Sequence, residues 1–208
     1  LAGLIVVAAT MAVLPASASA ACPMPSAPTT FSTSWNGGSG HYNNDANWSN
    51  SAPTAVCDAS TPAAGAYTVT MNAGSNAKSM TIGGAGSNPT LQISAENANT
   101  NLLVVSGALS IASGASLTLV CNVAPPGCGA PNVSAPTISN AGTFTVDATV
   151  NGMPFISGQL TNTGTMQFNH TAKFNNGAVT NQSTFNIADG VTVTSSGSRG
   201  VMRPSCAG

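Results

Sequence analysis

The chain has 208 residues and a net charge of −1, and only 4% of its residues are charged, against about 25% in typical soluble domains. No basic patch exists to neutralise phosphate groups, which argues against nucleic acid as a partner. Disordered chains are usually charged and poor in apolar residues, whereas this chain is 42% hydrophobic, so we expect one folded domain.

The chain begins with the pattern of a secretory signal peptide. An apolar run over residues 4–14 is followed by the small residues Ala18, Ser19 and Ala20. We therefore expect residues 1–20 to be a signal peptide and the mature protein to be extracellular or at the cell surface. The run is too short to cross a bilayer, so we expect no transmembrane segment in the mature chain.

Export would permit disulfide bonds. The five cysteines lack the close pairs of a zinc site, and we predict no metal and no cofactor. Cys121 and Cys128 bracket a turn-rich loop, and Cys22 and Cys57 bracket the N-terminal segment, so we predict these two bridges. Cys206 is left without an assigned partner.

Residues 21–62 are expected to form an N-terminal cap. Trp35 and Trp48 are separated by turns rich in Gly and Asn, which favours a looped hairpin with the two rings packed together. A stack of repeats needs such a cover, because its first coil otherwise exposes strand edges and apolar core.

One short phrase then returns along the chain. NAGTFTV, NTGTMQF and NQSTFNI begin at Asn140, Asn162 and Asn181, at intervals of 22 and 19 residues. We align the copies on a frame residue, which is Gly142, Gly164 and Ser183 in turn. SGALSI at residues 106–111 and KSMTIGG at residues 78–84 are interpreted as earlier copies. A period near 20 residues is typical of repeat architectures.

Within each copy apolar and polar residues alternate, which predicts a half-buried β-strand. We predict an all-β protein, a single-stranded parallel β-helix over residues 63–196 with coils of about 20 residues. Asn140, Asn162 and Asn181 would then stack as a ladder of side-chain amides at one corner. The alternative is a β-sandwich, which would lack the 20-residue echo. Residues 197–208 are expected to be a truncated C-terminal segment, with any anchor in missing sequence.

The segment SWNGGSGHYNNDANWSNSAPTAVCD at residues 34–58, followed by repeats rich in Gly, Asn and Thr, resembles the opening of bacterial secreted β-helical surface proteins. These include autotransporter passengers and anchored extracellular β-solenoids. Where that opening often has a second Trp, this chain has Tyr42. The resemblance implies a parallel β-helix, export and a surface role, and it implies no particular activity.

We expect an exported structural or adhesive module without catalytic residues, whose Asn, Thr and Ser faces meet carbohydrate or another surface. The alternative is a polysaccharide lyase or hydrolase, which needs converging ionisable groups. The candidates for such a group are Asp147, His170, Lys173 and Asp189.

A lesser alternative is an ice-binding solenoid, because Thr-x-Thr occurs at residues 68–70, 143–145 and 192–194. An ice-binding face needs such pairs in register. Thr143 lies one residue after its frame residue and Thr192 nine residues after its own, which predicts that the pairs are out of register.

Overall fold

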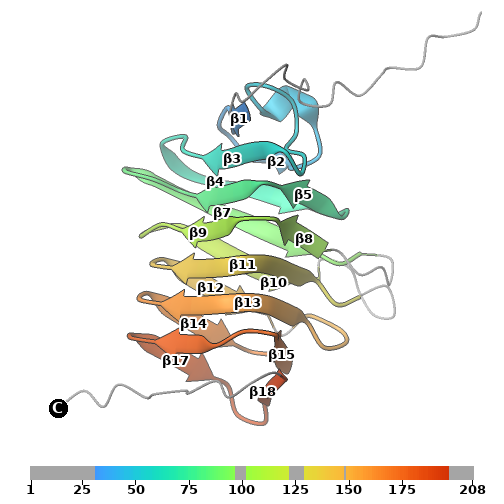
Figure 1. Ribbon diagram of the computed structural model, residues 1–208, viewed down its shortest axis with the longest axis vertical. Coiled ribbons are helices and arrows are strands. Elements are labelled where there is room, and N and C mark those ends of the chain that lie inside the picture. The colour runs from blue at the N-terminus through green and yellow to red at the C-terminus, as the bar shows by residue number, and fades with distance from the viewer. Residues whose placement is uncertain (1–30, 97–101, 122–128, 148, 197–208) are drawn as a thin grey trace, which may run out of the picture.

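The computed structural model describes residues 31–96, 102–121, 129–147 and 149–196. Within these residues the chain winds into a parallel β-helix, whose strands stack from β1 at one end to β18 at the other (Figure 1). Every pairing between its named strands is parallel. The predicted fold class is confirmed.

The described strands form two sheets, between which the chain alternates. The seven-stranded sheet consists of β2 (Gly40–His41), β4 (Gly65–Met71), β7 (Ser87–Ser94), β10 (Ser116–Val120), β12 (Thr143–Val146), β14 (Thr165–Phe168) and β17 (Thr184–Ile187). The eleven-stranded sheet consists of β1 (Phe31–Ser34), β3 (Cys57–Thr61), β5 (Ser75–Ala77), β6 (Ser79–Ile82), β8 (Leu102–Val105), β9 (Ala108–Ile111), β11 (Asn132–Asn140), β13 (Phe155–Asn162), β15 (Ala172–Asn175), β16 (Val179–Asn181) and β18 (Val193–Ser196). A single 3₁₀ turn, η1 (Asp45–Asn47), interrupts the described strands.

The core lies between the two sheets and follows from the alternation of apolar and polar residues. One inner column of the seven-stranded sheet is fully buried along five successive coils, at Val69, Leu91, Leu117, Phe144 and Met166. Since side chains alternate across a strand, the residues immediately before and after each of these positions in its strand face outward. The parallel register therefore stacks like on like, both inside and outside the helix.

The phrases that begin at Asn140, Asn162 and Asn181 occupy equivalent places in three successive coils, as predicted. The interpretation of residues 106–111 and 78–84 as earlier copies of the phrase is wrong. Residues 108–111 and 79–82 form β9 and β6 of the eleven-stranded sheet, whereas β12, β14 and β17 of the three later copies belong to the other sheet. The true equivalent of Gly142 is Ala115, which precedes β10. Each coil contains more than one alternating strand, so the alternation alone does not reveal which sheet a segment joins.

The cap aromatics pack as predicted. Trp35 and Trp48 form an antiparallel bridge, and their ring centroids lie 5.1 Å apart with the rings nearly perpendicular. Tyr42 packs on Trp48 at the same distance, and the indole N–H of Trp48 donates to the Tyr42 carbonyl at 2.7 Å. The strand β3 pairs with both β1 and β6, so the eleven-stranded sheet runs through the predicted boundary at residue 62.

Candidate functional site

The outer side of six strands of the seven-stranded sheet carries two columns of polar side chains, and we call this surface the threonine face. The first column contains only hydroxyl side chains, namely Thr68, Thr90, Ser116, Thr143, Thr165 and Thr184. The second column mixes hydroxyl and amide side chains, namely Thr70, Gln92, Thr118, Thr145, Gln167 and Asn186.

The geometry of the threonine face is set by the backbone. Neighbouring members of a column lie about 4.8 Å apart, the separation of hydrogen-bonded strands, and the two columns lie about 6.6 Å apart, the rise of two residues. No register shift interrupts the pairings of β4, β7, β10, β12, β14 and β17. The face therefore repeats in two directions.

The polar groups of this face are directed to solvent rather than to other parts of the described chain. Of the twelve side chains, only Gln167 makes a side-chain hydrogen bond within the described residues, to Asn169 at 2.8 Å. The strands that carry the face contain no Asp, Glu, Lys or Arg. The outward positions of the two columns contain no aromatic residue. The arrangement offers a regular array of neutral donors and acceptors.

The predicted out-of-register arrangement of the threonine pairs is wrong for two of the three pairs. Residues 68–70 and 143–145 stand in the same two columns. Residues 192–194 lead into β18 of the other sheet and are out of register with them, as predicted. Sequence reasoning missed the intervening coils, in which Ser, Gln or Asn takes the place of one threonine. The signal for these coils in the sequence is a polar–apolar–polar pattern, in which one apolar residue separates the two outward polar residues.

The asparagine ladder is confirmed, and it supports the threonine face from inside. The amide of Asn140 donates to Asn162 Oδ1 at 2.7 Å, and the amide of Asn162 donates to Asn181 Oδ1 at 2.6 Å. The same amides also donate to the carbonyls of Thr165 and Thr184, each at 2.9 Å. Both carbonyls belong to the first column, so the ladder fixes the corner at which the face begins.

The frame residue of the phrase is glycine for a steric reason. A Cβ on Gly142 would collide with the carbonyl oxygens of Ala115 and Ala112, and one on Gly164 would collide with that of Gly142. The corner turns so tightly that each coil rests on the backbone of the coil before it. Ser183 takes this place in the last described coil.

The structure brings three of the predicted enzyme candidates to one corner. Asp147 follows β12, His170 follows β14 and Asp189 follows β17, and these strands are in register. The Asp147 carboxylate accepts from the backbone N–H of Thr149 at 2.9 Å, as in an ordinary turn. Lys173 lies on β15, with its ammonium 6.0 Å from the centroid of the Phe155 ring. In the described chain the ion pair between Lys78 and Asp58 is the only one, so none joins these candidates.

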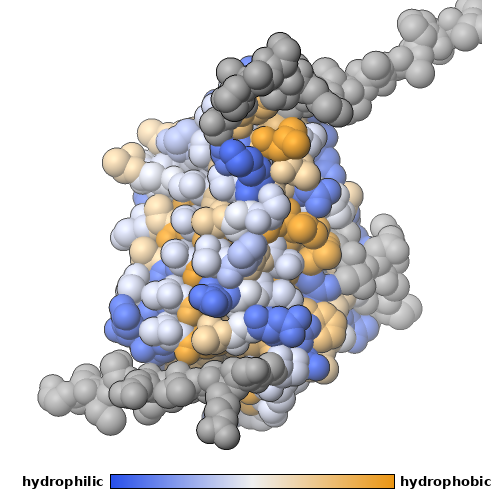
Figure 2. Space-filling model, in the orientation of Figure 1, coloured by the Kyte–Doolittle hydropathy of each residue, from blue (hydrophilic) through white to orange (hydrophobic). Residues whose placement is uncertain are grey.

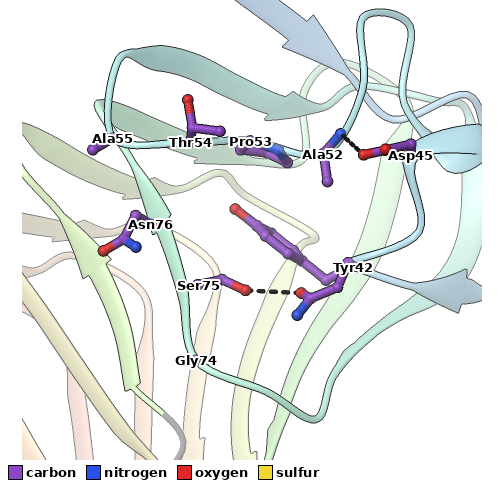
Figure 3. A pocket seen from close by; sticks show the side chains of 10 residues that line it. Tyr42, Asp45, Ala52, Pro53, Thr54, Ala55, Gly74, Ser75 and Asn76 are labelled. Atoms are coloured by element: carbon purple, nitrogen blue, oxygen red, sulfur yellow. Dashed lines mark hydrogen bonds between the residues drawn. The ribbon is translucent and has the colours of Figure 1, made fainter. Parts of the chain in front are cut away.

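A cavity of about 310 Å³ lies where the cap meets residues 74–76 (Figure 3). Tyr42 points into the space between residues 52–55 and 74–76, and its buried hydroxyl makes no hydrogen bond within the part of the chain that the structure describes. Burial raises the pKa of Tyr42 well above its usual 10.0, because the phenolate would be deprived of water. Asp45 accepts from the backbone N–H of Ala52 at 2.9 Å, and Ser75 donates to Asn43 at 2.8 Å. The polar groups of the cavity wall are thus partly used within the fold.

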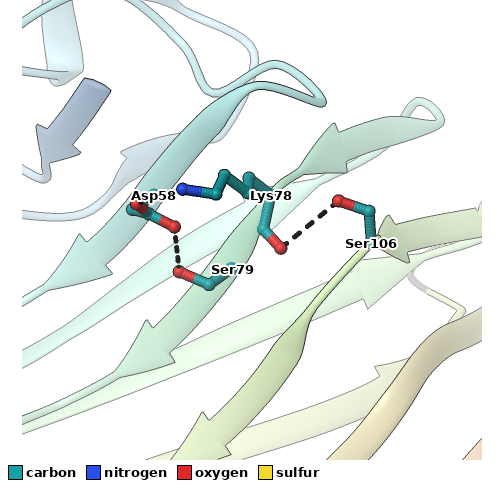
Figure 4. Close-up of polar contacts among 4 residues, drawn as sticks. All are labelled: Asp58, Lys78, Ser79 and Ser106. Atoms are coloured by element: carbon teal, nitrogen blue, oxygen red, sulfur yellow. Dashed lines mark hydrogen bonds and ion pairs between the residues drawn. The ribbon is translucent and has the colours of Figure 1, made fainter. Parts of the chain in front are cut away.

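The outer side of the eleven-stranded sheet is less uniform. It has one hydroxyl column, at Ser34, Ser60, Thr81, Ser110, Ser139, Thr161 and Thr180. Beside that column Asp58 accepts from Ser79 at 2.5 Å and pairs with Lys78 at 3.2 Å, and the Lys78 carbonyl accepts from Ser106 (Figure 4). The pairing of β11 with β13 also contains a register shift. In Figure 2 hydrophilic and hydrophobic residues are mixed on the side of the molecule turned to the viewer.

Cys57 and Cys121 are buried and in the disulfide form. The predicted partners Cys22 and Cys128 lie outside the described residues, as does Cys206, so the pairings stay predictions. The predicted signal peptide at residues 1–20 and the C-terminal segment at residues 197–208 lie outside them too.

Among the described residues, no three His, Cys, Asp or Glu side chains form a group that could hold a metal ion. The same part of the chain holds no helix long and apolar enough to cross a membrane. Comparisons of the chain with protein-family models, with curated proteins and with solved structures found no match.

Proposed function

We propose that the chain is a rigid adhesive module, which attaches through its threonine face to an extended surface with a repeating polar structure. The observation that carries the proposal is the register of the face. Twelve neutral polar side chains repeat in two directions, and eleven of them make no side-chain hydrogen bond within the described residues. A partner that repeats in the same way could engage many of them at once.

Rigidity is what makes such a surface useful for binding. A side chain that is already ordered before binding loses little entropy when it meets its partner. Threonine is stiff at χ1 because its Cβ is branched, and eight of the twelve columnar residues are threonine. The buried core and the asparagine ladder hold the strands beneath them.

The proposal includes export of the protein to the cell surface or the medium. The signal-peptide pattern of residues 1–20 and the resemblance of residues 34–58 to bacterial secreted β-helical proteins support it. The disulfide form of Cys57 and Cys121 accords with an oxidising compartment. Both the location and the bacterial resemblance remain proposals.

A sedimentation assay tests the adhesive function. The full 208-residue chain would be mixed with suspensions of cellulose, chitin and hydroxyl-coated silica and with an ice slurry, and the solid-bound fraction measured. We expect binding to at least one solid, with loss of binding in Thr118→Lys, which places a long charged side chain in the middle of the face.

Ser110→Lys is the matched control, because Ser110 lies in the hydroxyl column of the other sheet. Circular dichroism would show that both variants fold. Absence of binding to every solid would refute an adhesive role, and loss of binding only in Ser110→Lys would show that the wrong face had been chosen.

A further inference from the structure

The spacing within the columns determines how water must lie on the threonine face. The strands that carry neighbouring hydroxyls lie about 4.8 Å apart, and within the described residues no two hydroxyls of the first column hydrogen-bond each other, unlike Ser34 and Ser60 of the other sheet. A water molecule can bridge two such groups. The first column therefore provides five successive gaps, between six hydroxyl groups, in which a bridging water fits.

The second column provides a parallel rank of water sites. Because the two columns run alongside each other in unbroken register, the waters on them form a two-dimensional array rather than a single file. Threonine also carries a methyl group beside each hydroxyl. The methyl groups cannot hydrogen-bond, so they confine the neighbouring waters to the positions that the hydroxyls and the other waters leave open.

We propose that the threonine face binds ice, an inference that rests on the proposed adhesive function and names the surface. Ice presents a periodic array of water oxygens, each able to donate and to accept hydrogen bonds. A face that already holds its own water in a periodic array can join that lattice without rearranging. The hydroxyl and amide groups of both columns can both donate and accept, as such a lattice requires.

The residue types that the threonine face lacks favour ice over the other partners. A charged partner would need charges of opposite sign, and the strands of the face carry none. A protein partner would usually be met by Trp, Tyr, Met or Arg anchors at the centre of the interface. A sugar ring exposes an apolar face of C–H groups, whose burial calls for apolar or aromatic side chains. None of these residue types occurs among the twelve columnar residues.

The eleven-stranded sheet provides an internal comparison. Its hydroxyl column is also in register, but the neighbouring positions include the Asp58 carboxylate, and Ser34 and Ser60 hydrogen-bond each other at 3.2 Å. A second regular rank of water sites is therefore missing there. The ice-binding inference is specific to the threonine face.

The deciding experiment is partition into slowly growing ice. A dilute solution of the full chain is frozen slowly on a cold finger, and the fraction of protein in the ice is compared with that of a non-binding protein of similar size. We expect the wild type to be enriched in the ice and Thr118→Lys to be excluded to the level of the non-binding protein. Ser110→Lys should partition as the wild type does.

A second variant isolates the hydroxyl groups. Thr143→Val with Thr145→Val keeps the branched shape and the methyl groups while it removes two hydroxyls, one from each column. We expect this variant to fold and to be enriched less than the wild type. Recrystallisation of a polycrystalline ice film, watched by microscopy, should be slowed by the wild type and by Ser110→Lys only.

The outcomes separate this inference from the proposed function. Enrichment in ice that Thr118→Lys abolishes supports both. Exclusion of the wild type from ice, together with face-dependent binding to cellulose, chitin or silica, overturns ice binding and leaves the adhesive function standing. Exclusion from ice and from every other solid overturns both. Enrichment in ice that is insensitive to Thr118→Lys but lost in Ser110→Lys overturns the assignment of the face.

Discussion

The middle of the asparagine ladder should be its most sensitive point, and Asn162→Ala tests this. Asn162 is fully buried. Its Oδ1 accepts from Asn140, and its amide donates to Asn181 Oδ1, to the Thr184 carbonyl and, at 3.3 Å, to the Gly164 carbonyl. The amide nitrogen carries two hydrogens, so its three contacts amount to about two hydrogen bonds, and with the bond accepted from Asn140 they give a loss of about 3 kcal/mol in the free energy of unfolding. For a domain of this size the midpoint of thermal unfolding should fall by about 6–12 °C.

The two ends of the ladder provide graded controls. Asn181→Ala removes two side-chain hydrogen bonds at a half-buried position where water can replace them, so we expect a loss of about 1 kcal/mol. Asn140→Ala also removes two, but it deletes a buried acceptor oxygen that has no partner, which offsets part of the loss. The expected order of destabilisation is Asn162→Ala first, then Asn140→Ala, then Asn181→Ala.

Two spectroscopic probes distinguish unfolding of the cap from unfolding of the coils that contain the ladder. Stacked coils contact mainly their neighbours, so damage in one region need not unfold the rest at the same temperature. Trp35 and Trp48 lie in the cap that follows β1, whereas the ladder begins on β11 and runs toward the other end of the helix (Figure 1), so their fluorescence reports on the cap alone. Circular dichroism reports on all the strands. We expect Asn162→Ala to lower the dichroism midpoint more than the fluorescence midpoint. Midpoints of the three alanine variants equal to that of the wild type would refute the ladder as a source of stability.

Three further predictions use the same unfolding measurements. Gly164→Ala should destabilise by at least about 2 kcal/mol, because its Cβ meets a carbonyl of the previous coil, whereas Ser183→Ala at the equivalent place should change stability by less than about 0.5 kcal/mol. Tyr42→Phe removes a buried hydroxyl that has no partner and should stabilise by about 1 kcal/mol. Burial raises the pKa of Tyr42 in the folded state, so the folded protein resists deprotonation of this side chain. The free energy of unfolding of the wild type is therefore constant, as far as Tyr42 is concerned, below the unfolded pKa of 10.0, and it falls as the pH rises above that value. The wild type should then fall behind Tyr42→Phe by up to about 1.4 kcal/mol per pH unit, and parallel pH profiles would contradict this. Ile111→Thr, which places a hydroxyl donor beside the orphan oxygen of the ladder, should destabilise less than Ile82→Thr in the coil before it, and the reverse order would contradict the explanation.

The sequence was sufficient for the fold where the polar and apolar residues alternate around a fixed landmark. The phrases that begin at Asn140, Asn162 and Asn181 predicted three strands, one corner and the amide ladder. The tryptophan pair predicted the packing of the cap rings. In each case the pattern recurs at a short range that a single sequence displays directly.

The threonine face could not be found in the same way. From Thr68 to Thr90 the coil advances 22 residues, from Thr90 to Ser116 it advances 26 and from Ser116 to Thr143 it advances 27, and then 22 and 19 follow. These differences arise in loops and corners of unequal length, and they shift the outward residues against any fixed period. The columns become visible only once the strands are paired.

The inner column beside the corner explains why the ladder begins where it does. Its members, coil by coil, are Thr61, Ile82, Ile111, Asn140, Asn162 and Asn181. Each amide donates to the oxygen of the amide in the next coil. Asn140 is the first amide of the series, and the residue at its place in the preceding coil is Ile111, which cannot donate to the Asn140 oxygen. Upstream, hydroxyl groups close the same corner, since Tyr67 and Ser87 both donate to the Thr61 carbonyl. Different side chains thus hold one corner at both ends of the helix. The strands of the threonine face start after this corner. From the inner column to the first column of the face the chain advances seven, eight and five residues in the first three coils and three residues in each of the last three, so the parallel strand pairing, and not a corner of constant length, keeps the outward hydroxyls in register.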